Sequence, residues 1–156
     1  MKLLRAMIII ALSFQPVTSM AEQTSGTNVG ADLPPKVRTL LLQEMTIILE
    51  TTKDILEAMV RGQNEVVAKK AQAIHDSFIM KQEMTAADKK ALKASVPNEF
   101  LERDQAFHQL AARLAEAARK EDNAAQNQLF SEMINACAEC HSKHAMGQFP
   151  EFSSPD

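Results

Sequence analysis

Two cysteines and a histidine near the C-terminus are the residues best able to do chemistry in this sequence. They form the run Cys137-Ala138-Glu139-Cys140-His141, and the chain has no other cysteine. Thiols three residues apart on a helix lie one turn apart on the same face, so both can add to the two vinyl groups at one edge of a haem. His141 then lies beneath the ring, where its imidazole can bind the iron. The spacing therefore predicts one covalently attached haem c per chain.

Other uses of a Cys-x-x-Cys-His run fit this sequence less well. A structural zinc site needs four ligands and usually a second cysteine pair, whereas only Glu139 and His144 are available nearby. A thioredoxin-type dithiol needs a βαβ context, which the sequence does not predict. A haem-free helical interaction protein, binding partners through a methionine-rich face, is the remaining alternative.

The N-terminus has the pattern of a secretory signal peptide. Lys2 and Arg5 precede an apolar run over residues 6–12, and Ser19 and Ala21 are the small residues expected before a cleavage site. The run is shorter than the roughly 20 residues that cross a bilayer, which disfavours an N-terminal membrane anchor. We therefore expect export to the periplasm, cleavage after Ala21 and no membrane span in the mature chain.

The charge balance constrains the partners. Removal of residues 1–21 takes away two of the 17 basic residues and none of the 20 acidic ones, so the formal charge falls from −3 to −5. No basic stripe could release counterions from phosphate, so a nucleic-acid partner is not expected. An acidic surface favours a basic redox partner protein through electrostatic steering. The sequence offers no nucleophile-and-base arrangement and no paired carboxylates, so we do not expect an enzyme.

The folded domain is bounded by changes in composition. Residues 22–35 are small, polar and interrupted by Gly and Pro, which predicts a flexible leader. Immediately after this leader, apolar residues recur every three or four positions as far as Gly62, which has the position of a helix C′ glycine. Residues 148–156 contain two prolines and are expected to form a loose tail. The domain is therefore predicted to span residues 36–147.

Four long helices with short links are expected in this domain. No segment alternates with the period of two that a β-strand would have. Amphipathic helices of this kind bury their apolar stripes best as an all-α, antiparallel four-helix bundle, which can hold a flat apolar cofactor. The haem would then be attached to the C-terminal helix. The predicted elements are a first helix over 36–61, a second over 64–81, a short helix that Thr85 and Asp88 cap and Pro97 ends, a third long helix over 98–120 and a fourth that Asp122 or Asn123 caps and that ends near Gly147.

A haem-binding run on the last helix resembles the class II c-type cytochromes, the family of cytochrome c′ and its six-coordinate relatives. The similarity covers roughly residues 36–146 and is tightest from Phe107 to His141. The family commonly has an aromatic residue three positions after the haem histidine and a basic residue next, whereas this chain has His144 and Ala145 there. The matching residues are Phe107, Leu110, Leu114, Ala117-Ala118, Asp122, Phe130, the Cys-x-x-Cys-His run and the first-helix end Val60-Arg61-Gly62-Gln63.

The resemblance implies that a first-helix residue covers the distal side of the iron. A methionine there would give a six-coordinate haem suited to electron transfer, whereas a non-ligating leucine would leave room for small gases such as nitric oxide or carbon monoxide. Arg38 lies four residues before Leu42, as the family often has, which favours Leu42 as a non-ligating cover. Periodicity places Met45 inward, between Leu41 and Ile48, which favours Met45 as the distal ligand. A core methionine filling a gap is the structural alternative.

The sequence therefore predicts a periplasmic cytochrome that carries single electrons, with a five-coordinate gas-binding haem protein as the alternative. A thioether ligand opposite histidine stabilises ferrous iron. The resemblance also implies a homodimer through the first helices, which Leu49 and Leu56 would permit, although core packing explains these leucines equally. The roles of the other histidines, His75, His108 and His144, stay open.

Overall fold

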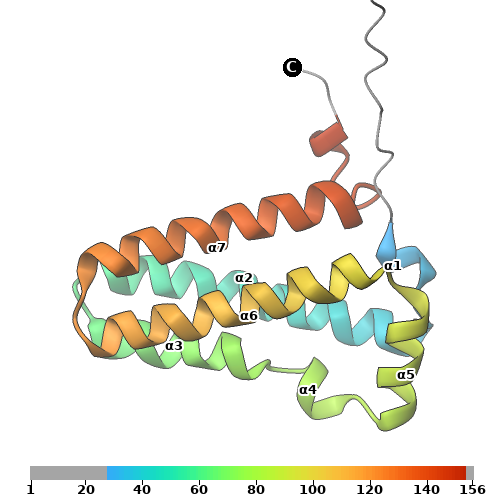
Figure 1. Cartoon of the computed structure of the whole chain (residues 1–156), viewed down its shortest axis with the longest axis horizontal. Coiled ribbons are helices and arrows are strands. Elements are labelled where there is room, and N and C mark those ends of the chain that lie inside the picture. The colour runs from blue at the N-terminus through green and yellow to red at the C-terminus, as the bar shows by residue number, and fades with distance from the viewer. Residues whose placement is uncertain (1–27, 154–156) are drawn as a thin grey trace, which may run out of the picture.

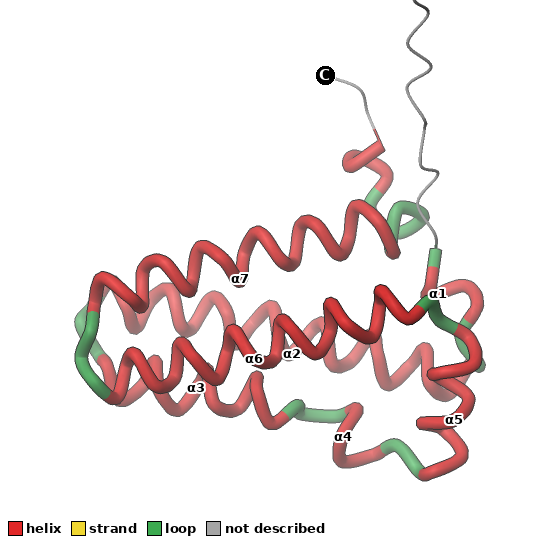
Figure 2. Tube along the Cα trace, in the orientation of Figure 1, coloured by secondary structure: helices red, strands yellow, loops and turns green. Residues whose placement is uncertain are grey.

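Four long helices dominate the computed structural model, which describes residues 28–153 (Figures 1 and 2). The predicted all-α fold, an antiparallel four-helix bundle, is confirmed. The predicted signal peptide over residues 1–21 lies outside the described residues. The long helices are α2 (Pro35–Val60), α3 (Asn64–Asp76), α6 (Asn98–Arg119) and α7 (Asn123–His144), and the short elements are α1 (Val29–Asp32), α4 (Met80–Glu83), α5 (Ala86–Ser95) and the 3₁₀ helix η1 (Pro150–Ser153).

The chain order decides which long helices are neighbours. Each long helix runs opposite to the one before it, and α4 and α5 carry the chain from α3 to α6 at one end of the bundle (Figure 1). The end of α7 and the short helix α1 lie at that same end. α7 packs mainly against α6, and α2 packs mainly against α3. The helix that carries the Cys-x-x-Cys-His run is therefore held in place by α6.

Local signals set the ends of the helices as the sequence predicts. Gly62 has a φ of 67°, and the chain closes α2 with hydrogen bonds from the Gln63 N–H to the Ala58 carbonyl (2.9 Å) and from the Gly62 N–H to the Met59 carbonyl (3.1 Å). This is the Schellman arrangement that a C′ glycine permits. At the start of α5, Thr85 and Asp88 form a reciprocal capping box.

The core has two parts. The larger cluster lies between the four long helices and includes Ile55, Ile74, Leu114 and Met133, none of which exposes any side-chain surface. Burial of each such side chain stabilises the fold by about 1.5–3 kcal/mol. The smaller cluster joins α1, α2, α5 and α6, and its buried members are Val29, Leu33, Val37, Leu92, Val96 and Phe100.

The second predicted helix, over 64–81, ends earlier than expected. α3 stops at Asp76, and Ser77 adopts a φ of 63°, which breaks the helix. The N–H groups of Phe78, Ile79 and Met80 all donate to the carboxylate of Glu44 on α2, with Phe78 at 3.0 Å and Met80 at 3.1 Å. A carboxylate that takes up these donors replaces the helical hydrogen bonds that would have continued α3.

The predicted leader and tail are more ordered than expected where the structure describes them. Val29 and Leu33, within the predicted flexible leader over 22–35, are 2% and 3% exposed and belong to the smaller core cluster. The Arg38 side chain donates to the Ala31 carbonyl (2.6 Å) and so holds α1 against α2. Part of the predicted loose tail forms η1. Residues 22–27 and 154–156 lie outside the described residues.

Candidate functional site

The helix α7 begins at a defined residue, and this fixes where its reactive side chains lie. The Asp122 carboxylate accepts the Ala125 N–H (3.0 Å) and caps the helix, which makes it the cap among the two candidates that the sequence offers, Asp122 and Asn123. Leu129 and Met133 are 6% and 0% exposed and belong to the larger core cluster. The inward face of α7 is thereby set, and the Cys-x-x-Cys-His run occupies the turns that follow Met133.

Cys137 and Cys140 are half-buried free thiols one turn apart on α7. Burial raises the pKa of both thiols above its ordinary value, and the nearby Asp104 carboxylate raises the pKa of Cys140 further. Both side chains therefore stay protonated at neutral pH. Addition to a vinyl double bond requires a reduced cysteine, and neither cysteine is in a disulfide.

His141, on the same helix, is half-buried, and burial lowers the pKa of its imidazole. The neutral form is therefore favoured, which is the form that binds metals. The ring of Phe149 lies almost parallel to the imidazole, with centroids 4.5 Å apart and an interplanar angle of 18°. The nitrogen lone pair of an imidazole lies in the ring plane, so a ring stacked on the face leaves it available to iron.

The two candidates for the distal position lie on α2 and differ in exposure. Met45 is half-buried and packs against the larger core cluster, which also contains Met133 of α7. Leu42 is 52% exposed and lines a shallow surface hollow with Thr39 and Ile79. The structure therefore places Met45 toward the interior of the bundle and Leu42 on its outer surface.

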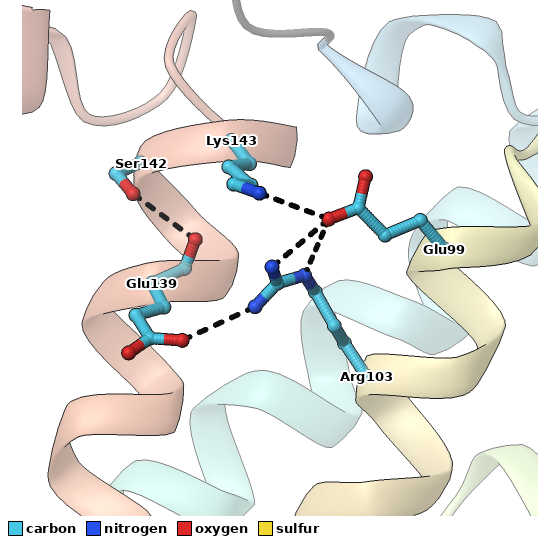
Figure 3. A network of polar contacts seen from close by, with 5 residues as sticks. All are labelled: Glu99, Arg103, Glu139, Ser142 and Lys143. Carbon is cyan, nitrogen blue, oxygen red and sulfur yellow. Dashed lines mark hydrogen bonds and ion pairs between the residues drawn. The ribbon is translucent and has the colours of Figure 1, made fainter.

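A polar network fastens the reactive turns of α7 to α6 (Figure 3). Arg103 donates to Glu99 through Nε (2.9 Å) and to Glu139, which lies between the two cysteines, through Nη1 (3.2 Å). Lys143 donates to the same Glu99 oxygen (3.0 Å). The hydrogen bonds from Lys143 and Arg103 lower the pKa of Glu99, which keeps that carboxylate charged. These solvent-exposed pairs fix the orientation of α7 more than they stabilise the fold.

Neither Glu99 nor Arg103 was predicted from the sequence to belong to this site. Their spacing of four residues is the signal of a helical ion pair. However, the contacts that matter for α7 join residues 36 and 44 positions apart in the chain. Such contacts depend on how α6 and α7 pack together, and no local pattern encodes them.

The remaining histidines lie at helix contacts. His144 is 5% exposed and packs edge-on against Phe100 at 5.7 Å, and burial lowers its pKa. His108 Nδ1 lies 2.7 Å from the Ile74 carbonyl, and His75 Nδ1 lies 3.0 Å from the His108 carbonyl. The last two contacts join α3 to α6, which gives His75 and His108 a structural role.

Residues 28–153 lack two features, a cluster of metal-binding side chains and a membrane-spanning helix. No three histidine, cysteine, aspartate or glutamate side chains in this part of the chain come close enough together to hold a metal ion. No helix within the same residues has both the length and the apolar character needed to cross a bilayer.

Comparison with known proteins gave one match. The family model described as cytochrome C′ matches residues 38–144, which include both candidates on α2 and the whole Cys-x-x-Cys-His run on α7. No curated protein and no solved structure matches this chain.

Proposed function

Because the chain belongs to the cytochrome c′ family and is thus a c-type haem protein, we propose that it carries single electrons between redox partner proteins in the periplasm. The observation that supports this best is the set of Cys137, Cys140 and His141 on adjacent turns of α7, half-buried and with both thiols free. When bound, the haem iron supplies the chemistry, since it gains and loses one electron. The protein residues hold and orient the group.

In this proposal, Cys137 and Cys140 hold one haem c through thioether bonds, and His141 is the proximal iron ligand. The polar network of Arg103 and Glu139 keeps these turns of α7 against α6, so the three side chains keep a fixed relation to the bundle. An iron ligand held in a fixed place moves little when the iron changes its charge. Electron transfer is faster when the protein rearranges little during the redox change. The cytochrome c′ family is generally non-enzymatic, and the proposed role requires no substrate pocket.

Met45 is the proposed distal ligand. It is half-buried against the core, whereas Leu42 is 52% exposed. A thioether ligand supplied by Met45 would stabilise ferrous iron and raise its reduction potential, which suits an electron carrier. The alternative function, a five-coordinate haem protein that binds nitric oxide or carbon monoxide, requires a residue that covers the iron without binding it, as Leu42 would.

Carbon monoxide separates the two functions. If Met45 binds the iron, the reduced wild-type protein changes its visible spectrum slowly or incompletely with carbon monoxide, and Met45→Ala changes rapidly and completely. Met59→Ala is the matched control, because Met59 is also a partly buried methionine of α2 packed on the same core cluster. Rapid, complete binding by the wild type, or a Met45→Ala variant with the wild-type spectrum, would rule out Met45 as ligand.

Export and association complete the proposal. The N-terminal pattern supports a signal peptide cleaved after Ala21, and the formal charge of −5 in the remaining chain supports a basic redox partner. Leu49 and Leu56 on α2 are 56% and 50% exposed, which supports a homodimer through this helix.

A further inference from the structure

The C-terminal tail is folded back toward the end of α7 by contacts that fix its path. The N–H groups of Gln148 and Phe149 both donate to the Ala145 carbonyl, at 2.9 and 3.0 Å. Ala145 also forms an isolated antiparallel bridge with Asn28. A Cβ atom at Gly147 would come within 2.2 Å of the Asn28 side-chain nitrogen, so a larger residue here would require the Asn28 side chain to move. The turn after α7 is therefore built to a definite shape.

This turn brings Phe149 onto the imidazole of His141. The two rings are 4.5 Å apart and 18° from parallel. Phe152, the next aromatic residue, meets Phe149 edge-on at 6.5 Å. Of these two phenylalanines in the tail, Phe149 is therefore the one that stacks on His141.

A parallel ring restricts the imidazole in a defined way. Rotation of a histidine ring about its Cβ–Cγ bond is otherwise broad, because the ring torsion has no sharp staggered wells. A neighbouring ring held 4.5 Å away on one face hinders this rotation and keeps water from that face. The two nitrogen atoms lie at the ring edge, so their bonding is not blocked.

We propose that Phe149 is a positioning residue for the iron ligand His141, fixing the plane of the imidazole by stacking on its face. The inference rests on the proposed function, in which His141 binds the iron. Phe149 acts through His141 and does not touch the iron, so its removal changes the orientation of the ligand without removing the ligand.

The test uses NMR spectra of the oxidised, haem-loaded protein, because the paramagnetic shifts of the haem methyl groups depend on the orientation of the axial imidazole. Phe149→Leu removes the stacked ring and is expected to change the pattern of these shifts. Phe149→Tyr keeps a stacked ring and is expected to retain the wild-type pattern. Phe152→Leu is the matched control, since it removes a phenylalanine of the same tail that is 47% exposed, and it is expected to leave the shifts unchanged.

The outcomes distinguish this inference from the proposed function. Wild-type shifts in haem-loaded Phe149→Leu would overturn the inference alone, as would an equal change in Phe152→Leu, which would assign the effect to the tail as a whole. A wild-type chain purified without haem, shown by a pyridine haemochrome assay, would overturn both. Phe149 is 36% exposed and lies beyond the four long helices, so we expect its variants to fold, which far-ultraviolet circular dichroism checks.

Discussion

Glu44 is a buried carboxylate whose removal should destabilise the bundle far more than its place on an amphipathic helix suggests. It is 2% exposed and accepts the N–H groups of Phe78, Ile79 and Met80, where the chain leaves α3. Glu44→Ala would leave all three donors without this acceptor. We therefore expect the α3–α4 connection to loosen. We also expect α2 to be held less firmly against this connection, because the three hydrogen bonds between them are lost.

The structure gives the size of the effect. A hydrogen bond to a charged group contributes about 1.5–3 kcal/mol, so three such bonds give an upper range of about 4.5–9 kcal/mol. Phe78, Ile79 and Met80 are only half-buried, so water can reach their N–H groups once the carboxylate is gone. Removing a buried charge also relieves its desolvation cost. We therefore expect Glu44→Ala to lower the free energy of unfolding by about 3 kcal/mol.

Urea unfolding followed by circular dichroism measures this difference. Glu50→Ala is the matched control, because Glu50 lies on the same helix, is exposed and makes one ion pair with Lys53. Its loss should change the free energy of unfolding by no more than about 0.5 kcal/mol. A loss below about 1 kcal/mol for Glu44→Ala would refute the reasoning, since that is less than one bond to a charged group. Glu44 is next to Met45 on α2, so the variant also tests whether the Glu44 hydrogen bonds set the orientation of Met45.

Two further changes test local features of the fold. Hydrogen bonds, the largest from Lys36 and the next from Thr85, lower the pKa of Asp88 from 3.8 to about 2. This carboxylate therefore stabilises the folded state above pH 3.8, and its contribution is lost as the pH falls toward 2. Asp88→Asn should lower the melting temperature at pH 7 and have little effect near pH 2, whereas an equal difference at both pH values would contradict the assignment. Glu121, just after α6, has a φ of 56°, a conformation that strains any residue with a side chain. Glu121→Gly should therefore raise the free energy of unfolding, measured in urea, by about 0.5–1 kcal/mol. A lower free energy of unfolding would argue against strain at this residue.

Helix positions followed from local signals in the sequence. The Asp122 cap, the Thr85 capping box and the Gly62 C′ glycine are each formed as predicted, because each depends on residues within one turn. The predicted first helix over 36–61 differs from α2, at Pro35–Val60, by one residue at each end. The family resemblance also agreed with the comparison with known proteins, since it rested on the position of the Cys-x-x-Cys-His run within the chain.

Features that depend on long-range contacts were not predicted. The buried face of α2 contains Glu44, and a pattern built from apolar residues cannot place a carboxylate there. The early end of α3 depends on that same side chain, which is 34 residues from Phe78 in the sequence. Val29 and Phe149 lie in segments whose composition suggests no structure, yet the first is buried and the second stacks on His141. Short segments of this kind gain order from the surface on which they pack.

The intact mass of the exported protein under denaturing conditions shows whether the haem is covalently attached to Cys137 and Cys140. Denaturation releases a haem held only by iron ligands, whereas thioether bonds to Cys137 and Cys140 survive it. We predict the mass of the chain that begins after Ala21 plus one haem, and the mass of the chain alone for a Cys137→Ser, Cys140→Ser double variant. A wild-type protein with the mass of the bare polypeptide would contradict covalent haem attachment at α7.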